Sequence, residues 1–239
     1  MNMEMIDFYK ASLEKFVGCD CDELAAGTPS APSIWLFGNE HGKDKNPHDG
    51  TLPDIDTDQY SISTQRKWRY NQKAFKLLAA MNGYKVDDWK KFADDKQPFV
   101  KGTTGYFKGN LFPFACHDVH HWPDDNKKET GMDDKHHYQE WCRKHRIPAI
   151  RSWVEEYQPK VFIGVGIGYR DDFSRAALGN DSRLVEDSIS DGTRIRRVFY
   201  QINGKTKLVI VPHFSSAYGL NSNALLQAAG EFIANIGKL

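Results

Sequence analysis

The sequence predicts an α/β domain with three layers, α/β/α, in which helices cover both faces of a mostly parallel central sheet. Short apolar runs alternate along the chain with amphipathic stretches of helical periodicity, the order expected of strand–helix repeats. With 239 residues, of which 40% are hydrophobic and 27% charged, the chain can bury one large core. We therefore expect a single domain over residues 1–239, in which residues 1–32 form an N-terminal helix and a lead-in.

Local patterns predict the elements of the first half. Apolar residues at helical spacing predict a helix over residues 3–16, and the run SIWLFG predicts a buried strand over residues 33–38. The polar, turn-rich residues 42–63 predict a long loop. A helix with start and stop signals is expected over residues 63–83, followed by a short strand over residues 105–114.

The middle of the chain continues the alternation of strands and helices. Residues 115–134 are polar and predict a second loop. Residues 135–157 predict one helix interrupted at Pro148, or two helices in sequence. The run PKVFIGVG predicts a buried strand over residues 159–166, and residues 169–178 predict the helix that follows it.

Two apolar runs near the C-terminus flank Asn203-Gly204, a dipeptide typical of tight β-hairpin turns. They predict strands over residues 197–202 and 206–211, and an amphipathic pattern predicts a final helix over residues 222–239. Ligands of parallel α/β sheets bind beyond the carboxyl ends of the strands. We therefore expect the functional residues at those ends.

The charge balance excludes a protein whose overall field attracts nucleic acid, because 32 Lys and Arg match 32 Asp and Glu. Basic clusters at residues 143–151 and 194–197 are local candidates for contacts with nucleic acid. The N-terminus lacks the pattern of a signal peptide, and no apolar stretch approaches the ~20 residues of a membrane helix. We expect a cytoplasmic monomer with no membrane partner.

Two strand ends carry residues suited to hydrolytic chemistry. Glu40 stands between Gly38 and Gly42, which allow a sharp turn and a close approach to a ligand. Its carboxylate could orient or deprotonate a water molecule, or it is a solvated turn residue. His213 and Ser215 follow the last strand and could donate hydrogen bonds to a developing anion. The alternative is that His213 is a satisfied structural side chain.

A third strand end carries an amide beside aromatic rings. Asn110 could read the edge of a planar heterocycle, and Phe112 or Phe114 could stack on its face; alternatively the rings are core and the amide caps a turn. The glycines of residues 164–168 are spaced GxGxG without a Walker lysine, which only weakly indicates a nucleotide-dependent enzyme. The histidines between residues 117 and 145 lack any zinc-binding spacing, so we predict no metal.

Taken in order, the segments FGNEHG, GNLFPF, PKVFIGVG and PHFSSAYGLN resemble the motifs of the uracil-DNA glycosylase superfamily over residues 33 to about 236. The resemblance implies a uracil-DNA glycosylase-like fold. It also implies hydrolysis of the N-glycosidic bond of a damaged or deaminated, uracil-type base in DNA. In that reaction Glu40 positions the water and His213 stabilises the leaving base. The implied base-binding residues are Gly38, Asn39, His41, Gly42, Asn110, Phe112, Phe114 and Ser215.

The same resemblance implies contacts with DNA from the loop after His213, by Ser216, Tyr218 and Asn221. The chain departs from the family pattern at several positions. Glu40 and His41 stand where the family has Asp, Asn or Ala followed by Pro; Phe214 replaces a proline; and Ala217 or Tyr218 replaces an intercalating leucine. These departures favour single-stranded or distorted DNA. They also keep open the alternative of a non-catalytic protein that binds a nucleobase or nucleic acid on the same fold.

The four cysteines follow the order found in the iron–sulfur class of these glycosylases. The resemblance would make Cys19, Cys21, Cys116 and Cys142 the ligands of a [4Fe–4S] cluster. The close spacing of the first pair and the long gap between the last two depart from that class. We therefore expect four free cysteines and no cofactor, with the cluster as the alternative.

Overall fold

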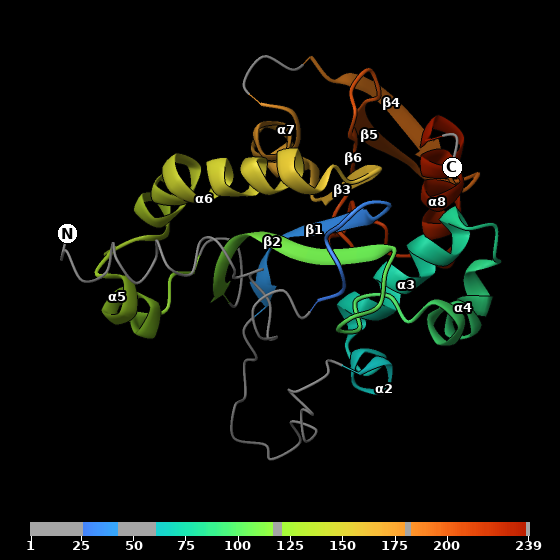
Figure 1. The fold of residues 1–239 in the computed structure, drawn as a ribbon, viewed down its shortest axis with the longest axis horizontal. Coiled ribbons are helices and arrows are strands. Elements are labelled where there is room, and N and C mark those ends of the chain that lie inside the picture. Colours follow the sequence, from blue (N-terminus) through green and yellow to red (C-terminus); the bar gives the residue numbers. More distant parts are fainter. Residues whose placement is uncertain (1–25, 43–60, 117–120, 180–182, 238–239) are drawn as a thin grey trace.

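The computed structural model describes residues 26–42, 61–116, 121–179 and 183–237. Its centre is a six-stranded mixed sheet with the strand order β2-β1-β3-β6-β5-β4 (Figure 1). Four neighbouring strands are parallel, namely β2 (Tyr106–Cys116), β1 (Ile34–Gly42), β3 (Val161–Val165) and β6 (Lys207–Val211). Two antiparallel strands extend the sheet beyond β6, namely β5 (Ile195–Gln201) and β4 (Val185–Ser190). The predicted α/β class with a mostly parallel sheet is confirmed.

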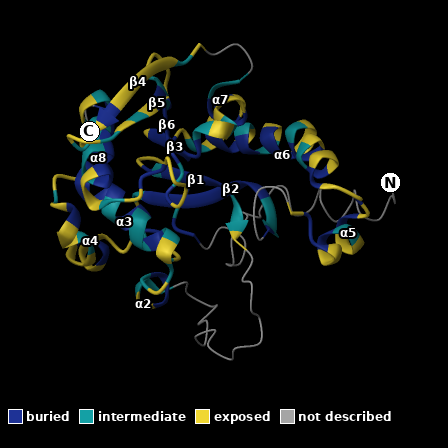
Figure 2. Cartoon of the chain, turned by 180° about the vertical axis from the view of Figure 1, so that it is seen from behind, coloured by how far each residue is buried: buried dark blue, intermediate teal, exposed yellow. Residues whose placement is uncertain are grey.

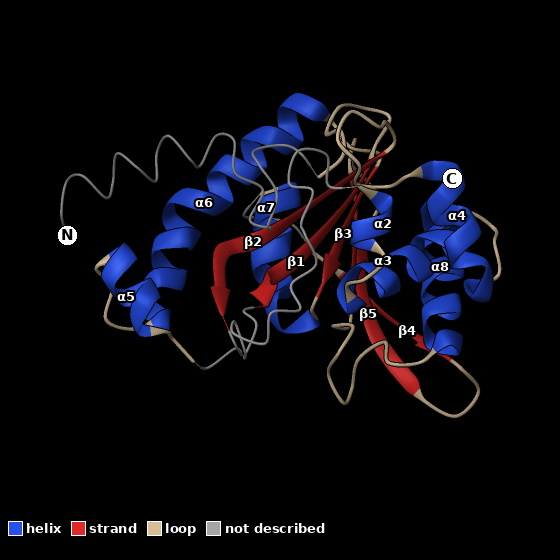
Figure 3. Ribbon diagram, turned by 90° about the horizontal axis from the view of Figure 1, so that it is seen from below, coloured by secondary structure: helices blue, strands red, loops and turns tan. Residues whose placement is uncertain are grey.

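Helices lie on both faces of the sheet, in agreement with the expected three layers (Figures 1 and 3). One face is covered by α6 (Lys135–Tyr157) and α7 (Arg170–Leu178), and the other by α3 (Arg69–Met81) and α8 (Asn223–Gly237). Outside α3 lies α4 (Trp89–Lys96). The short elements are α2 (Ile62–Gln65), α5 (Asp124–Thr130) and the 3-10 turns η1 (Val86–Asp88) and η2 (Ile167–Tyr169).

Aromatic side chains of the central strands form the core beneath α6 and α7. Trp35 of β1 stacks on Phe37 with ring centroids 5.7 Å apart, and its ring lies 5.0 Å from that of Phe107 on β2. Phe37 in turn lies 4.8 Å from Phe162 of β3. All four are fully buried, and the central strands are accordingly dark in Figure 2. This apolar packing holds the strand ends in fixed positions.

The predicted strands and the hairpin are confirmed, with β1 running four residues further than expected, to Gly42. The hairpin joins β5 to β6, with Phe199 opposite Ile210. The predicted interruption at Pro148 is wrong, because α6 continues through it. Buried side chains on both sides of the proline, Ile147 and Ile150 among them, pack α6 onto the sheet and offset the lost hydrogen bond.

Other differences concern short or exposed elements. The predicted loop 115–134 contains α5, and neither α4 nor β4 was expected. The helix predicted over residues 3–16 lies outside the described residues.

The register of the parallel strands brings their carboxyl ends to one edge. Gly38 of β1 pairs with Asn110 of β2 on one side and with Val165 of β3 on the other. Val165 pairs in turn with Val211 of β6. The residues after these positions therefore share the sheet edge at which the sequence places the functional site.

Candidate functional site

The amide of Asn110 is seated directly against the backbone of Gly38. A Cβ atom added to Gly38 would lie 2.4 Å from Asn110 Oδ1 and 2.9 Å from the hydroxyl of Tyr70. Both separations are too short for any side chain, so only glycine permits this approach. Asn110 is 7% exposed, and its backbone carbonyl accepts a hydrogen bond from Arg146 Nη2 at 3.3 Å. The structure thus brings together the first two predicted strand ends.

A second amide, that of Asn39, is seated against Gly166 at the end of β3. Gly166 has φ +134°, and a Cβ atom there would lie 2.5 Å from Asn39 Oδ1. The Gly166 N–H donates to the carbonyl of Val211 at 2.8 Å, which ties this contact to the end of β6. Asn39 is 8% exposed, and its Oδ1 has no hydrogen-bond partner among the described residues. Such a buried acceptor costs about 1–3 kcal/mol, so it is suited to receiving a donor from a ligand.

His213 has a defined tautomer. The backbone N–H of Ser215 donates to His213 Nδ1 at 3.3 Å, and the Ser215 hydroxyl lies 3.0 Å from the same nitrogen. Because Nδ1 accepts this hydrogen bond, the neutral ring carries its proton on Nε2. Burial lowers the pKa of His213, and the charge of Lys73 lowers it further. The site therefore holds a neutral imidazole with Nε2–H as its donor.

Two residues of α3 connect the Asn110 end of the site with the His213 end. The hydroxyl of Tyr70 approaches Gly38, and its ring lies 5.1 Å from that of Phe214. Lys73 Nζ donates to the Phe214 carbonyl at 2.6 Å. Tyr70 and Lys73 were not predicted as site residues. The only signal for them in the sequence is that they stand one helical turn apart and so share one face of the helix.

Glu40 forms a buried ion pair that the sequence did not predict. Its Oε1 lies 2.8 Å from Nζ of Lys135, the first residue of α6, and the two side chains are 9% and 7% exposed. The charge of Glu40 also reaches Tyr169, whose pKa is raised by burial and then by this carboxylate. The predicted water-positioning group is therefore held in place by a lysine from another layer of the fold.

The two candidate stacking rings differ in exposure. Phe112 is fully buried, edge-on to Tyr169 at 5.4 Å, which leaves no free ring face for a ligand. Phe114 is half-buried and edge-on to Tyr138 at 5.5 Å. Its backbone N–H donates to the Tyr138 hydroxyl at 2.9 Å. Of the two, Phe114 keeps exposed surface.

The remaining predicted residues lie on the rim of the site. His41 is half-buried and Gly42 is exposed. In the loop after His213, Ser215, Ser216 and Asn221 are exposed, and Tyr218 is 83% exposed. The loop that follows His213 thus presents an unburied aromatic ring.

The cysteines and histidines give no metal centre within the part of the chain described. There, no group of three or more His, Cys, Asp or Glu side chains could hold a metal ion. Cys116 and Cys142 are both buried, and burial raises the pKa of Cys142 to about 12. Cys19 and Cys21 lie outside the described residues, so the cluster stays a prediction.

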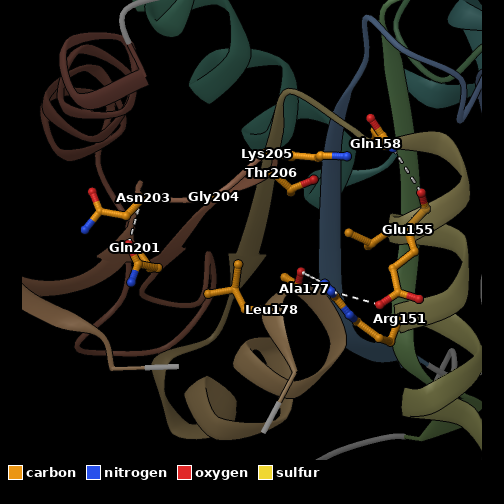
Figure 4. A pocket seen from close by; sticks show the side chains of 11 residues that line it. Arg151, Glu155, Gln158, Ala177, Leu178, Gln201, Asn203, Gly204, Lys205 and Thr206 are labelled. Atoms are coloured by element: carbon orange, nitrogen blue, oxygen red, sulfur yellow. Dashed lines mark hydrogen bonds and ion pairs between the residues drawn. The ribbon is translucent and has the colours of Figure 1, made fainter. Parts of the chain in front are cut away.

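Two hollows lie at opposite edges of the sheet. One, of about 440 Å³, is lined by Gln158 before β3 and Thr206 before β6, and so lies at the amino ends of the parallel strands (Figure 4). The other, of about 400 Å³, is lined by Gly168 and Tyr169 after β3, together with Arg143. The second hollow borders the predicted site, because Tyr169 contacts Phe112.

Comparison with models of known protein families and with curated proteins finds no match for this chain. The resemblance to uracil-DNA glycosylases therefore depends on the sequence motifs alone. None of the helices in the described part of the chain is both long and apolar enough to span a membrane.

Proposed function

We propose that this protein hydrolyses the N-glycosidic bond of a damaged or deaminated, uracil-type base in DNA. The observation that supports this most is the buried carbonyl oxygen of Asn39, which lacks a partner in the described structure at the sheet edge that also carries Asn110 and His213. Amides offer the donors and acceptors that the edge of a pyrimidine requires. The Nε2–H of His213 would donate to the base oxygen on which negative charge grows as the bond breaks.

Glu40 is proposed to orient the attacking water. Hydrolysis needs a water molecule held opposite the leaving base. A carboxylate can hold that water while Lys135 fixes its position, through the 2.8 Å ion pair. Glutamate is longer than the residues that the superfamily has at this position, so the water would stand further from the backbone.

The proposed partner is DNA that is single-stranded or already distorted. Tyr218, 83% exposed, is the aromatic ring available to insert between bases, with Ser216 and Asn221 beside it in the same loop. Phe114 has the exposed surface to stack on a base. A strand that needs no unpairing lowers the cost of presenting its base to the site.

The second candidate is a non-catalytic binder of a nucleobase or nucleic acid, favoured by the engagement of Glu40 with Lys135. In that case the ion pair is structural, and ligand binding is indifferent to the charge of Glu40. The two candidates differ in whether a base is released.

The experiment is base release from labelled oligonucleotides containing uracil, hypoxanthine or mismatched thymine, single-stranded and duplex, with alkali cleavage of abasic sites. Release should be lost in Glu40→Gln and in His213→Ala. It should persist in the control variants Glu155→Gln and His137→Ala, which change exposed side chains of α6. Binding without release by the folded wild-type protein supports the binder, and neither binding nor release overturns both candidates. Thermal unfolding of each variant separates loss of chemistry from loss of fold.

A further inference from the structure

The β4–β5 hairpin is attached to the loop that follows His213. Arg196 Nε donates to the Gly219 carbonyl at 3.3 Å, and Arg194 Nη1 donates to Asn221 Oδ1 at 3.1 Å. The Ser222 hydroxyl donates to Asp191 Oδ2 at 3.4 Å. The hairpin turn and the loop are therefore one connected surface.

The hairpin turn is itself tightly organised around Asp191. Its carboxylate accepts hydrogen bonds from the backbone N–H groups of Thr193, at 3.1 Å, and Arg194, at 2.8 Å. The Arg194 guanidinium lies 2.6 Å away, and the Asp191 side chain is only 3% exposed. The Arg194 amide and guanidinium hold the pKa of Asp191 well below its usual range. The turn is thus a preorganised support for its neighbours.

The antiparallel pairing places the start of β5 beside the end of β6. Phe199 pairs with Ile210, so the residues before Phe199 extend past the end of β6, where His213 follows. Alternation along a strand puts Ile195, Arg197 and Phe199 on one face. Arg170, the first residue of α7, lies over the Phe199 ring at 5.4 Å. Arg170 and Arg197 therefore share this face, at the same edge as the site.

These two arginines are available to an anion. Arg197 is 63% exposed and lies 3.6 Å from Glu186, and Arg170 is 47% exposed and lies 3.8 Å from Asp171. Exposed pairs of this kind contribute about 0–1 kcal/mol, so a phosphate can replace the carboxylates.

The other basic cluster, residues 143–151, is largely engaged inside the protein. Arg146 is fully buried, and Arg143 binds Asp172 through two of its nitrogens. Of its Lys and Arg side chains only Lys144 is exposed, so the hairpin, with Arg197 beside Arg170, is the better candidate.

Exposed apolar side chains lie on β5 and in the loop that it supports. Ile195 is 69% exposed and Tyr218 is 83% exposed. Tyr218 precedes Gly219, whose carbonyl is bound by Arg196. Exposed cationic side chains with an unburied ring in the adjoining loop suit single-stranded nucleic acid, in which phosphates contact the charges and bases stack on the ring.

We propose that the face formed by Arg170, Arg197 and Ile195 binds the phosphate backbone of a single DNA strand next to the nucleotide held at His213. This inference rests on the proposed function, because it takes DNA as the partner of the site. It assigns a role to the antiparallel hairpin, which lies outside the parallel part of the sheet. The hairpin supports the loop with Arg194 and Arg196 and contacts the strand with Arg197.

The test is the affinity of the protein for a fluorescein-labelled oligothymidine, measured by anisotropy at salt concentrations of about 50 to 200 mM. The double variant Arg170→Gln/Arg197→Gln should bind more weakly, with a slope of log affinity against log salt smaller by about 1.4, since each phosphate contact to a single strand contributes about 0.7. The matched control is Arg183→Gln/Lys205→Gln, which removes two exposed charges at the other end of the same hairpin strands. Figure 4 shows Lys205 there. The control should keep the wild-type slope.

Each outcome decides the inference separately from the proposed function. Equal slopes for the wild-type protein and the Arg170/Arg197 variant overturn the inference, even if base release is observed. A wild-type protein that does not bind the oligothymidine overturns it as well. A slope that is reduced in the Arg170/Arg197 variant but not in the control supports the strand-binding face. If that result is obtained and no base is released in any assay, only the proposed hydrolysis fails. Thermal unfolding of both double variants checks that they are folded.

Discussion

Replacing Lys135 by methionine should destabilise the protein strongly, because the buried Glu40 carboxylate then loses the ammonium group beside it. The two charged atoms lie 2.8 Å apart, and the side chains are 7% and 9% exposed. Removing one partner of a buried ion pair costs about 3–5 kcal/mol. For a protein of this size each kcal/mol lowers the melting temperature by about 2–4 °C, so a decrease of roughly 6–20 °C is expected.

The matched control is the exposed ion pair of Lys91 with Asp95, whose side chains are 68% and 39% exposed. Lys91→Met removes the same charge in the same way, and the expected cost is small because solvent screens an exposed pair. Unfolding by urea and by heat gives both values. The double variant Glu40→Gln/Lys135→Met should recover most of the stability lost by Lys135→Met, because the carboxylate charge is removed together with the ammonium group beside it.

Two results would refute this reasoning. Lys135→Met could cost no more than Lys91→Met, in which case the pair is effectively solvated. The costs of the two single changes at Glu40 and Lys135 could instead add up in the double variant, in which case the charges are not coupled. The double variant also separates stability from chemistry, since a stable protein without the Glu40 carboxylate should release no base if Glu40 orients the water.

Two further predictions concern the other parts of the site. Gly166→Ala should lower the free energy of unfolding by about 1–3 kcal/mol, because alanine is strained at φ +134° and its Cβ would meet the Asn39 amide. The control Gly168→Ala has open space around it and should change that free energy by less than about 0.5 kcal/mol. Urea unfolding measures both. Lys73→Met should raise the pKa of His213, measured by NMR titration of its ring protons, because the neighbouring charge lowers that pKa in the wild-type protein. The pKa of His213 in the folded protein lies below the ordinary value of 6.5, so as the pH falls His213 is protonated in the unfolded chain before it is protonated in the folded protein. Stability should therefore decrease from pH 6.5 downward, and less so in Lys73→Met; an unchanged His213 titration would exclude this charge effect.

The parts of the fold that the sequence predicted are those in which local pattern and burial agree. The runs of β1 and β3 are apolar because both strands are buried in the middle of the sheet, and Asn203-Gly204 marks the hairpin turn. By contrast, β4 is an edge strand with five of its six residues exposed, so it lacks an apolar alternation that could be recognised. Pro148 misled the prediction for α6, since tertiary packing outweighs its effect on the backbone.

The sequence predicted the neighbouring strand ends of the candidate site, but not the partners that are distant along the chain. Gly38, Asn110 and His213 follow apolar runs, and the rule for ligand sites in parallel sheets places them at one edge. Lys135 stands 95 residues from Glu40 along the chain, and Lys73 stands 141 residues from the Phe214 carbonyl that it binds. No local pattern relates such pairs, because only the packing of α6 and α3 on the sheet brings them together.

Two features of this sheet edge are unfavourable for folding alone. A buried ion pair such as that of Glu40 adds little net stability compared with apolar residues of the same size. The carbonyl oxygen of Asn39, buried without a hydrogen-bond partner among the described residues, costs about 1–3 kcal/mol. Both lie at the carboxyl end of β1, and Asn39 contacts Gly166, which is bonded to the end of β6. A ligand that donates to Asn39 and places a water molecule near Glu40 would offset both costs, and this favours a binding site over a structural explanation for that edge.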